Sequence, residues 1–151
     1  MSPLAVAIDP AGRFAYVANS DSSSVSAYAI DGRTGALAAV ALPVAAGQAP
    51  AFIAIHPSGK FAYVANTGSG SVSAFAIHPT TGALSSVGPP TPTGLSPRSI
   101  AIEPLGRYVY VPNFDSDTLS RYAVDAASGV LAPLEAAAAG RFPVAMAFAP
   151  V

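Results

Sequence analysis

The chain has 151 residues, of which 52% are hydrophobic and only 10% are charged, and its formal net charge is −1. This length fits one domain, and the near-neutral charge gives no electrostatic reason to expect a nucleic acid or membrane partner. Cysteine is absent, which excludes disulfides and thiolate zinc sites. No apolar run approaches about 18 residues and no signal peptide is visible, so we expect a soluble protein, cytoplasmic or exported with its leader removed.

The first four expected strands lie at residues 4–9, 14–19, 25–31 and 37–44. Turn-forming residues separate them, beginning with Pro10 and Gly12. Proline presets φ at the second position of a tight turn, and glycine accepts the positive φ that follows. The connection after the first strand is therefore expected to be a tight β-turn.

The same pattern returns twice at a period of 47 residues. The segment DPAGRFAYVAN at 9–19 returns as HPSGKFAYVAN at 56–66 and as EPLGRYVYVPN at 103–113. A fourth unit begins at 148–150, one residue short of the period. A period in this range that is built only from strands is typical of β-propeller blades.

The expected strands are apolar on both faces. Phe14 and Tyr16 point to one side of the second strand, while Ala15 and Val17 point to the other. A sheet with one solvent-exposed face would alternate apolar with polar residues. Because these strands are apolar on both faces, each sheet is expected to pack between two neighbouring sheets. We predict an all-β propeller segment in a single domain. Its three four-stranded blades and one extra inner strand are expected at 4–50, 51–97, 98–143 and 144–151.

Three blades are too few for a closed ring, since propellers typically have about four to eight. A monomer would expose two apolar outer faces of about 300–600 Å² or more, and covering both is worth about 10 kcal/mol or more. We therefore expect self-association, with a six-bladed homodimer favoured. In such a dimer the strand 144–149 competes with the partner's first strand for one position. The alternative is a fragment of a longer, single-chain propeller.

Several motifs extend beyond the turn. Tyr-Val-Ala-Asn at 16–19 and 63–66 is similar to the Tyr-Val-(Thr/Ala)-Asn repeat of bacterial and archaeal surface and periplasmic propellers. The pattern continues with Val-Ser-Ala-(Tyr/Phe)-Ala-Ile and then Thr-Gly-Ala-Leu at 34–37 and 81–84, with Ser-Gly-Val-Leu at 128–131. Together these motifs resemble the 6-phosphogluconolactonase-like β-propeller lactonase family, whose members are seven-bladed.

This resemblance implies His, Arg and Glu side chains at a central channel as the catalytic groups. Members that keep the activity commonly carry His-Pro-His before a central inner strand, where this chain has Ser-Pro-Arg-Ser at 96–99. The Asp-Leu-Gly-x-Asp stretch of that family appears here as Asn-Phe-Asp-Ser-Asp at 113–117. The resemblance is therefore specific for the blade and leaves the chemistry open.

Arg98 is the leading candidate site residue because it breaks the repeat. Its equivalents are apolar, namely Leu4, Ala51 and Val144. A cation at the start of an inner strand, beside the channel, would hold a carboxylate or a phosphate. The alternatives are that Arg98 caps loop carbonyls or pairs with Asp115.

Asp115 and Asp117 lie in a loop expected on the same face as Arg98, as does Asp21. They are candidate ligand contacts, or else solvated turn residues, and no metal site or cofactor is expected from them. Asn113 ends a strand beside them and joins the candidate ligand-binding set. Its recurrence as Asn19 and Asn66 favours a structural role, in which the side chain bonds neighbouring turn backbone.

Other polar residues receive structural interpretations. Asp9, His56 and Glu103 share one repeat position before the turn proline, so they are expected to start turns on the face opposite Arg98. An acid–base pair of His56 and Glu103 is the less favoured alternative. Arg121 replaces an alanine of the other repeats and is expected to mark a polar blade edge.

Three functions stay open. The first is a non-catalytic, lactonase-like propeller module that self-assembles and binds a small anionic or sugar-like ligand, or a protein, at the channel mouth. The second is lactone hydrolysis, with Arg98 stabilising negative charge and Asp115 activating water. The third is a truncated or engineered fragment without activity. No phosphate-binding loop and no Gly-x-Ser-x-Gly motif is present, so nucleotide binding and serine hydrolase chemistry lack support.

Overall fold

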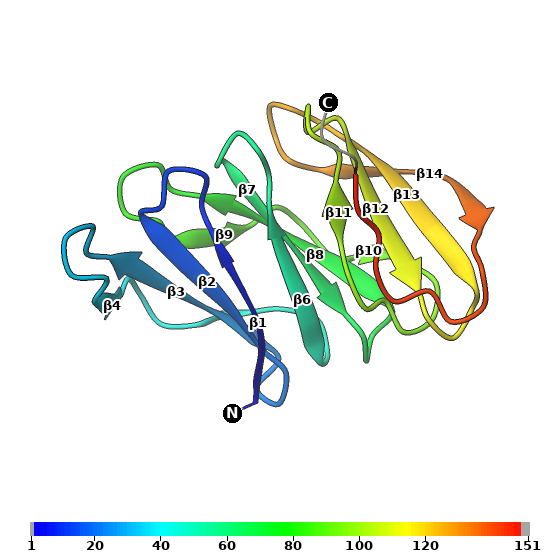
Figure 1. Cartoon of the computed structure of the whole chain (residues 1–151), viewed down its shortest axis with the longest axis horizontal. Coiled ribbons are helices and arrows are strands. Elements are labelled where there is room, and N and C mark those ends of the chain that lie inside the picture. The colour runs from blue at the N-terminus through cyan, green and yellow to red at the C-terminus, as the bar shows by residue number, and fades with distance from the viewer. Residues whose placement is uncertain (1, 149–151) are drawn as a thin grey trace.

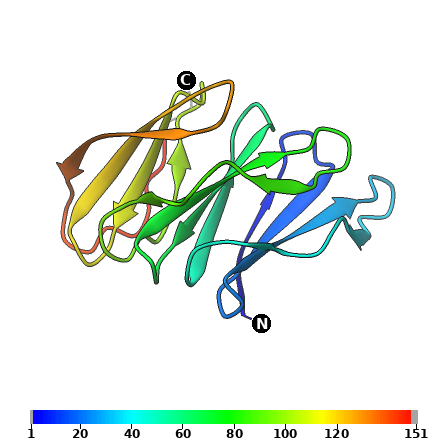
Figure 2. The ribbon, with the colours of Figure 1, turned by 180° about the vertical axis from the view of Figure 1, so that it is seen from behind.

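The computed structural model describes residues 2–148. These residues form three antiparallel β-sheets that stand side by side in chain order, and no helix occurs among them (Figure 1). The same fan of three sheets is seen from behind in Figure 2. The predicted all-β propeller segment is therefore confirmed, with each sheet forming one blade.

Blade 1 contains β1 (Pro3–Ile8), β2 (Phe14–Asn19), β3 (Ser24–Ile30), β4 (Leu37–Ala39) and β5 (Val44–Ala45). Blade 2 contains β6 (Pro50–Ile55), β7 (Phe61–Asn66), β8 (Ser71–Ile77), β9 (Leu84–Ser86) and β10 (Thr91–Pro92). Blade 3 contains β11 (Ala101–Ile102), β12 (Tyr108–Asn113), β13 (Thr118–Val124) and β14 (Leu131–Ala138). In every blade the strands pair in chain order, from the inner to the outer edge.

The outer strand differs from the expected continuous segment 37–44. In blade 1 it is split into β4 and β5, which pair with opposite ends of β3, and in blade 2 into β9 and β10, which pair with β8. Prolines interrupt both outer strands, at Pro43 and at Pro89-Pro90, and a proline has no N–H to donate to the ladder. In blade 3, β14 contains Pro133 and a β-bulge, but it runs on to Ala138 without being split.

The expected extra inner strand is not formed over residues 144–148, which take part in no β-ladder. This segment runs along blade 3 (Figure 1, red), and the ring centroid of Phe148 lies 5.5 Å from that of Tyr110. The reason is that its natural ladder partner, the second strand of a fourth blade, is not among the described residues. The rest of the expected strand, residues 149–151, lies outside them.

Apolar side chains fill both spaces between the blades. The first cluster joins Phe14, Tyr16 and Val25 of blade 1 to blade 2 residues such as Ile53 and Phe75. The second joins the opposite side of blade 2 to blade 3, and it includes Phe61, Tyr63, Val72, Val109, Val111 and Tyr122. We call the side of a blade that faces the next blade in the chain its front face, and the other side its rear face. Blade 2 is buried on both, as the sequence predicted.

A contact that we call the tyrosine–glycine contact recurs at each joint. The Tyr16 hydroxyl donates to the carbonyl of Gly82 at 3.0 Å, and the Tyr63 hydroxyl to that of Gly129 at 2.9 Å. Burial raises the pKa of Tyr16 to about 12, so the hydroxyl stays a proton donor. The rings of Phe14 and Phe61 press on the same two glycines, leaving no room for a Cβ.

A second contact, the asparagine cradle, holds the connection that enters each new blade. Asn66 Nδ2 donates to the hydroxyls of Ser71 at 3.1 Å and Ser73 at 2.9 Å, and Ser73 accepts from the Gly47 backbone N–H at 3.2 Å. A Cβ on Gly47 would lie 2.6 Å from the Asn66 side chain. Asn113 has equivalent contacts in blade 3, with Ser120 and Gly94. The predicted structural role is therefore correct, but the partners are strand hydroxyls and not turn backbone.

The turns after the inner strands form as predicted, each held by the polar residue before its proline. Asp9 Oδ1 accepts from the backbone N–H groups of Arg13 at 2.6 Å and Phe14 at 2.7 Å. Glu103 Oε1 accepts from the backbone N–H of Arg107 at 2.8 Å and from its Nε at 3.0 Å. His56 accepts the Ser58 N–H at 3.1 Å through Nδ1, and its Nε2 donates to the Gly106 carbonyl at 2.8 Å. Each side chain closes a turn.

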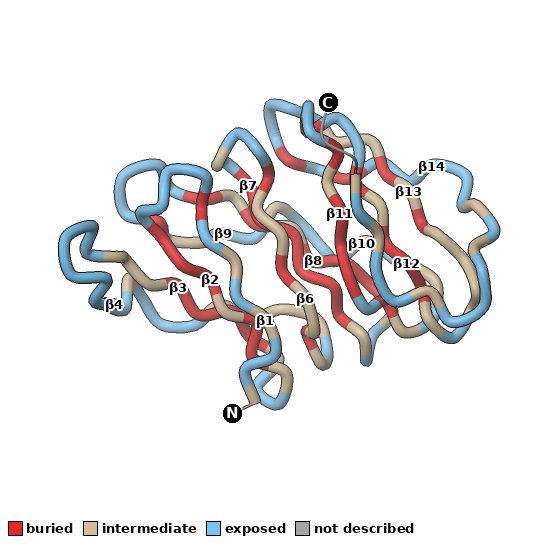
Figure 3. The backbone as a smooth tube through the Cα atoms, in the orientation of Figure 1, coloured by how far each residue is buried: buried red, intermediate tan, exposed pale blue. Residues whose placement is uncertain are grey.

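The two outer faces of the segment are uncovered to different degrees. On the rear face of blade 1, Leu4, Val6 and Ile8 of β1 are all more than half exposed. Figure 3 shows this contrast between β1 and the buried strands of blade 2. The front face of blade 3 is partly covered by Phe148, which is half-buried and lies against Tyr110.

The joint between blades 1 and 2 predicts a difference between two matched glycine variants. Gly82→Ala places a methyl group against the Phe14 ring, whereas Gly35→Ala meets nothing within 4 Å, at an equivalent φ of +74° compared with +73°. The backbone strain of about 1–2 kcal/mol is common to both, and overpacking adds about 1–3 kcal/mol to Gly82→Ala alone. Urea unfolding of the monomeric chain should show the larger loss of stability for Gly82→Ala, and equal losses would contradict this account of the joint.

Three carboxyl groups in the turns and loops make the stability of the fold depend on pH in the acid range. Hydrogen bonds from the Arg107 side chain and nearby backbone N–H groups lower the pKa of Glu103, and backbone donors lower those of Asp31 and Asp125. A carboxyl group whose folded pKa lies below its unfolded value stabilises the fold above the unfolded pKa of about 4, and this stabilisation is lost as pH falls through the folded value. The melting temperature should therefore fall between about pH 5 and pH 3. The melting temperature of Glu103→Gln should lie below that of wild type at pH 6 and approach it at pH 3. A difference in melting temperature that stays constant over this pH range would contradict the prediction.

Candidate functional site at the channel mouth

Arg98 lies where the inner strand of blade 3 begins, before β11. Its backbone N–H donates to the Pro112 carbonyl at 3.3 Å, which fixes it to β12. The guanidinium carbon lies 4.2 Å from the ring centroid of Phe114, a cation–π geometry. Within residues 2–148 the guanidinium takes part in no hydrogen bond and no ion pair. Neither alternative considered for Arg98, a loop-carbonyl cap or a pair with Asp115, is found there.

Arg98 borders a cavity of about 420 Å³, which we call the channel mouth. Its lining residues are Leu4, Ser20, Ala49, Ala51, Thr67 and Arg98. Leu4, Ala51 and Arg98 occupy one repeat position, so the three inner strands begin around this space. Arg98 is the one charged residue of this lining, and the rest is apolar or hydroxyl-bearing.

Asp115 borders an adjoining cavity of about 370 Å³, which shares Thr67 with the channel mouth. Its Oδ2 accepts a hydrogen bond from the Ser96 hydroxyl. The same contact recurs in blade 1, where the Ser2 hydroxyl donates to Asp21 at 2.6 Å. The structure therefore brings Arg98 and Asp115 into neighbouring cavities, and it also gives Asp115 a repeated role in holding its loop.

The other two candidates are engaged elsewhere. Asn113 is fully buried, and its side chain forms the asparagine cradle of blade 3. Asp117 Oδ1 accepts from the backbone N–H of Phe142 at 2.8 Å and so holds the connection that follows β14. Neither Asn113 nor Asp117 lines the channel mouth.

Phe114 is a site residue that the sequence reasoning missed. It forms the platform for the Arg98 guanidinium, and its other neighbour is Phe142, with ring centroids 5.0 Å apart. The signal was present in the repeat, because the equivalents of Phe114 are Ser20 and Thr67, which line the mouth. Blade 3 thus departs from the repeat twice at the same place.

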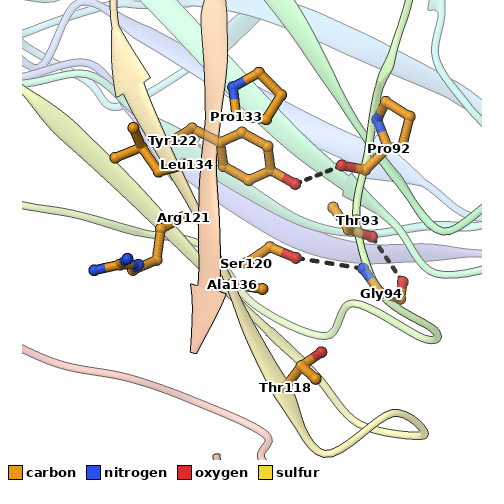
Figure 4. Close-up of a pocket in the computed structure, with 10 residues that line it drawn as sticks. All are labelled: Pro92, Thr93, Gly94, Thr118, Ser120, Arg121, Tyr122, Pro133, Leu134 and Ala136. Carbon is orange, nitrogen blue, oxygen red and sulfur yellow. Dashed lines mark hydrogen bonds between the residues drawn. The ribbon is translucent and has the colours of Figure 1, made fainter. Parts of the chain in front are cut away.

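A third cavity, of about 300 Å³, lies at the outer side of the joint between blades 2 and 3 (Figure 4). The Tyr122 hydroxyl reaches the Pro92 carbonyl at 2.6 Å, and the Gly94 N–H donates to Ser120 at 3.3 Å (Figure 4). Arg121 points away from these contacts, and its Nε donates to the Glu135 carbonyl at 2.8 Å. This cavity belongs to the joint between two blades. Arg121 lies on β13, which has β14 on its outer side, so it does not mark the edge strand of blade 3.

Residues 2–148 contain neither a metal-binding cluster nor a membrane-spanning helix. No group of three or more His, Cys, Asp or Glu side chains there could hold a metal ion. No helix long and apolar enough to cross a membrane occurs among them either.

Comparison with known proteins identifies the family of this chain. A candidate 6-phosphogluconolactonase from Bacteroides uniformis is 29% identical, with a TM-score of 0.85 over 93% of this chain and 41% of that protein. A periplasmic gluconolactonase from Pseudomonas aeruginosa is also 29% identical, with a TM-score of 0.79 over 89% of this chain and 39% of that one. The chain therefore spans about two fifths of the length of these structures, and comparison with curated proteins gives no match. The sequence pattern of one family, described as "Lactonase, 7-bladed beta-propeller", matches residues 1–50 and 39–148, and the chain belongs to this family of seven-bladed β-propeller lactonases.

Proposed function

We propose that the chain is a lactonase-like propeller module that self-associates into a ring and binds a small anionic, sugar-like ligand at the channel mouth. One observation carries the ligand part of this proposal. Arg98 presents a guanidinium that has no acceptor among residues 2–148, stacked on Phe114, at a cavity bordered by the starts of all three inner strands.

The chemistry of the mouth selects the ligand class. Stacking on Phe114 occupies the face of the guanidinium and leaves its N–H groups at the edge free to bind a carboxylate or a phosphate in two-point fashion. Leu4 and Ala51 offer apolar contact for the carbon face of a sugar, while Ser20 offers a hydroxyl to its hydroxyl groups. The Thr67 hydroxyl donates to the Pro97 carbonyl at 2.7 Å and so offers a ligand only its oxygen as an acceptor. The names of the two structural neighbours support gluconate or 6-phosphogluconate, or their lactones, as the first ligands to test.

Lactone hydrolysis is the second candidate, and membership of the lactonase family favours it. In this reaction water attacks the lactone carbonyl carbon, the ring C–O bond breaks, and a proton passes to the departing alkoxide. Arg98 would stabilise the negative charge that develops on the carbonyl oxygen, and Asp115 would take the proton of the attacking water. The Ser96 hydroxyl occupies one Asp115 oxygen, Oδ2, and the other is available for this purpose.

Substitution of Arg98 tests the ligand site. Arg98→Ala should weaken 6-phosphogluconate binding about 10- to 100-fold in calorimetry, because a hydrogen bond to a charged group is worth about 1.5–3 kcal/mol. Arg98→Lys should lose less, since it keeps the charge without the two-point geometry. Arg121→Ala is the matched control and should bind like wild type. Equal affinity of wild type and Arg98→Ala would contradict the proposal.

Hydrolysis of gluconolactone and its 6-phosphate separates the two candidate functions. For a binding module we expect no turnover above the spontaneous rate at pH 7, measured by proton release in weakly buffered solution. Turnover that disappears in Arg98→Ala and in Asp115→Asn would instead establish the hydrolase. Turnover that both variants keep would place the chemistry elsewhere in the molecule.

A further inference from the structure

We propose that Tyr110 of one copy and Gly35 of a second copy form the docking contact of the ring, so that blade 3 of one chain packs on blade 1 of the other. This inference rests on the self-association proposed above and specifies the surfaces and their register. The partner is a second copy of this chain, joined head to tail.

The joints inside the chain are the template for this contact. At each joint a front face supplies an aromatic ring and a tyrosine hydroxyl, and the following rear face supplies one glycine. Tyr16 donates to Gly82, and Tyr63, 47 residues after Tyr16, donates to Gly129, 47 residues after Gly82. Both glycines have a positive φ, and both carry an aromatic ring where a Cβ would stand.

One half of this contact is open at each end of the segment. Gly35 is the glycine of blade 1, with φ +74° and nothing within 4 Å of the position of a Cβ. Tyr110 is the tyrosine of blade 3, and its hydroxyl takes part in no hydrogen bond within residues 2–148. Tyr108, the counterpart of Phe14 and Phe61, is 37% exposed, whereas those two rings are buried.

The asparagine cradle repeats the same pattern independently. Blades 2 and 3 receive Gly47 and Gly94 in their cradles. The cradle of blade 1 is assembled, with Asn19 Nδ2 donating to Ser26 at 2.9 Å, but it receives no glycine among the described residues. Gly140, which follows β14 at the corresponding place, has nothing within 4 Å of its Cβ position. One rigid placement of a second copy would fill both open contacts.

Burial along the inner strands supports this placement. Val6 in β1 is 65% exposed, whereas its repeat equivalent Ile53 in β6 is 3% exposed because a blade precedes it. A docked copy would give β1 the same cover. Two chains joined in this way at both ends would have two-fold symmetry and leave no rear face uncovered, with a wider angle between blades than in the seven-bladed family to which the chain belongs.

A docking second copy would displace the segment 144–148 from the front face of blade 3. Phe148 lies on Tyr110, where a docked Ile8 would lie, since Phe148 and Ile8 hold one repeat position. The segment has no ladder partner in the structure, whereas β1 pairs with β2 along its length. The incoming β1 therefore keeps its hydrogen bonds, and 144–148 gives up only side-chain contacts.

The test compares two variants that each remove one tyrosine hydroxyl. Tyr110→Phe removes it from the contact that a second copy would complete, and Tyr63→Phe removes it from the contact with Gly129 inside the chain. Light scattering over a concentration series gives the dissociation constant of the complex. Tyr110→Phe and Gly35→Ala should each raise it about tenfold or more, because every substitution occurs twice in a symmetric dimer. Tyr63→Phe should lower the melting temperature and leave the dissociation constant within about twofold of wild type.

The double variant Tyr110→Phe/Gly35→Ala checks that the two positions meet. If Tyr110 and Gly35 contact each other across the interface, the double variant should raise the dissociation constant by less than the product of the two single-variant fold-changes. Wild-type association in both single variants would overturn the docking contact and leave self-association standing. A wild-type chain that stays near 15.0 kDa at every concentration would overturn self-association as well, and would assign both faces to further blades of a longer chain.

Discussion

The structure depends on apolar packing between sheets, and the tyrosine–glycine contact sets the spacing and register of that packing. Tyr16 and Tyr63 reach across to a carbonyl of the next blade, and this reach is possible because the facing residues, Gly82 and Gly129, have no side chain. A hydrogen bond has one good length, so it selects a single placement among the many that a smooth apolar face would permit. Blade 2, with a neighbour on each side, is the one described blade with both faces buried.

The channel mouth follows from this spacing. Leu4, Ala51 and Arg98 are distant in sequence, and they border one cavity because the joints bring the starts of the three inner strands together. The repeat supplies a frame that is nearly the same in every blade. Chemistry enters where blade 3 departs from it, with a cation in place of an apolar residue and an aromatic platform, Phe114, in place of a hydroxyl.

Much of the fold could be predicted because it repeats, and a turn or a face that is ambiguous once becomes clear in three copies. The blades, the turns after the inner strands and the burial of both faces were accessible in this way. The split of the outer strands was missed because the prolines that cause it were not weighed against ladder pairing. The partners of Asn66 and Asn113 were misjudged because they are hydroxyls on the adjacent strand of the same blade, and these face the asparagine only when the two strands pair in register. In the site, the positions of Arg98 and Asp115 were predicted, but the link from Asp115 to Ser96 and the role of Phe114 require three-dimensional placement.

The split outer strands have a consequence for how the molecule behaves among its neighbours in solution. An outer edge strand presents unpaired N–H and C=O groups, which invite pairing with any other free strand. In blades 1 and 2 the prolines leave only strands of two or three residues at that edge, too short to act as a template for another chain. Blade 3 is less protected, since β14 presents eight residues in one run, interrupted only by Pro133, a β-bulge and the charge of Glu135. Among the outer strands of residues 2–148, β14 is thus the one most open to unintended strand pairing and aggregation.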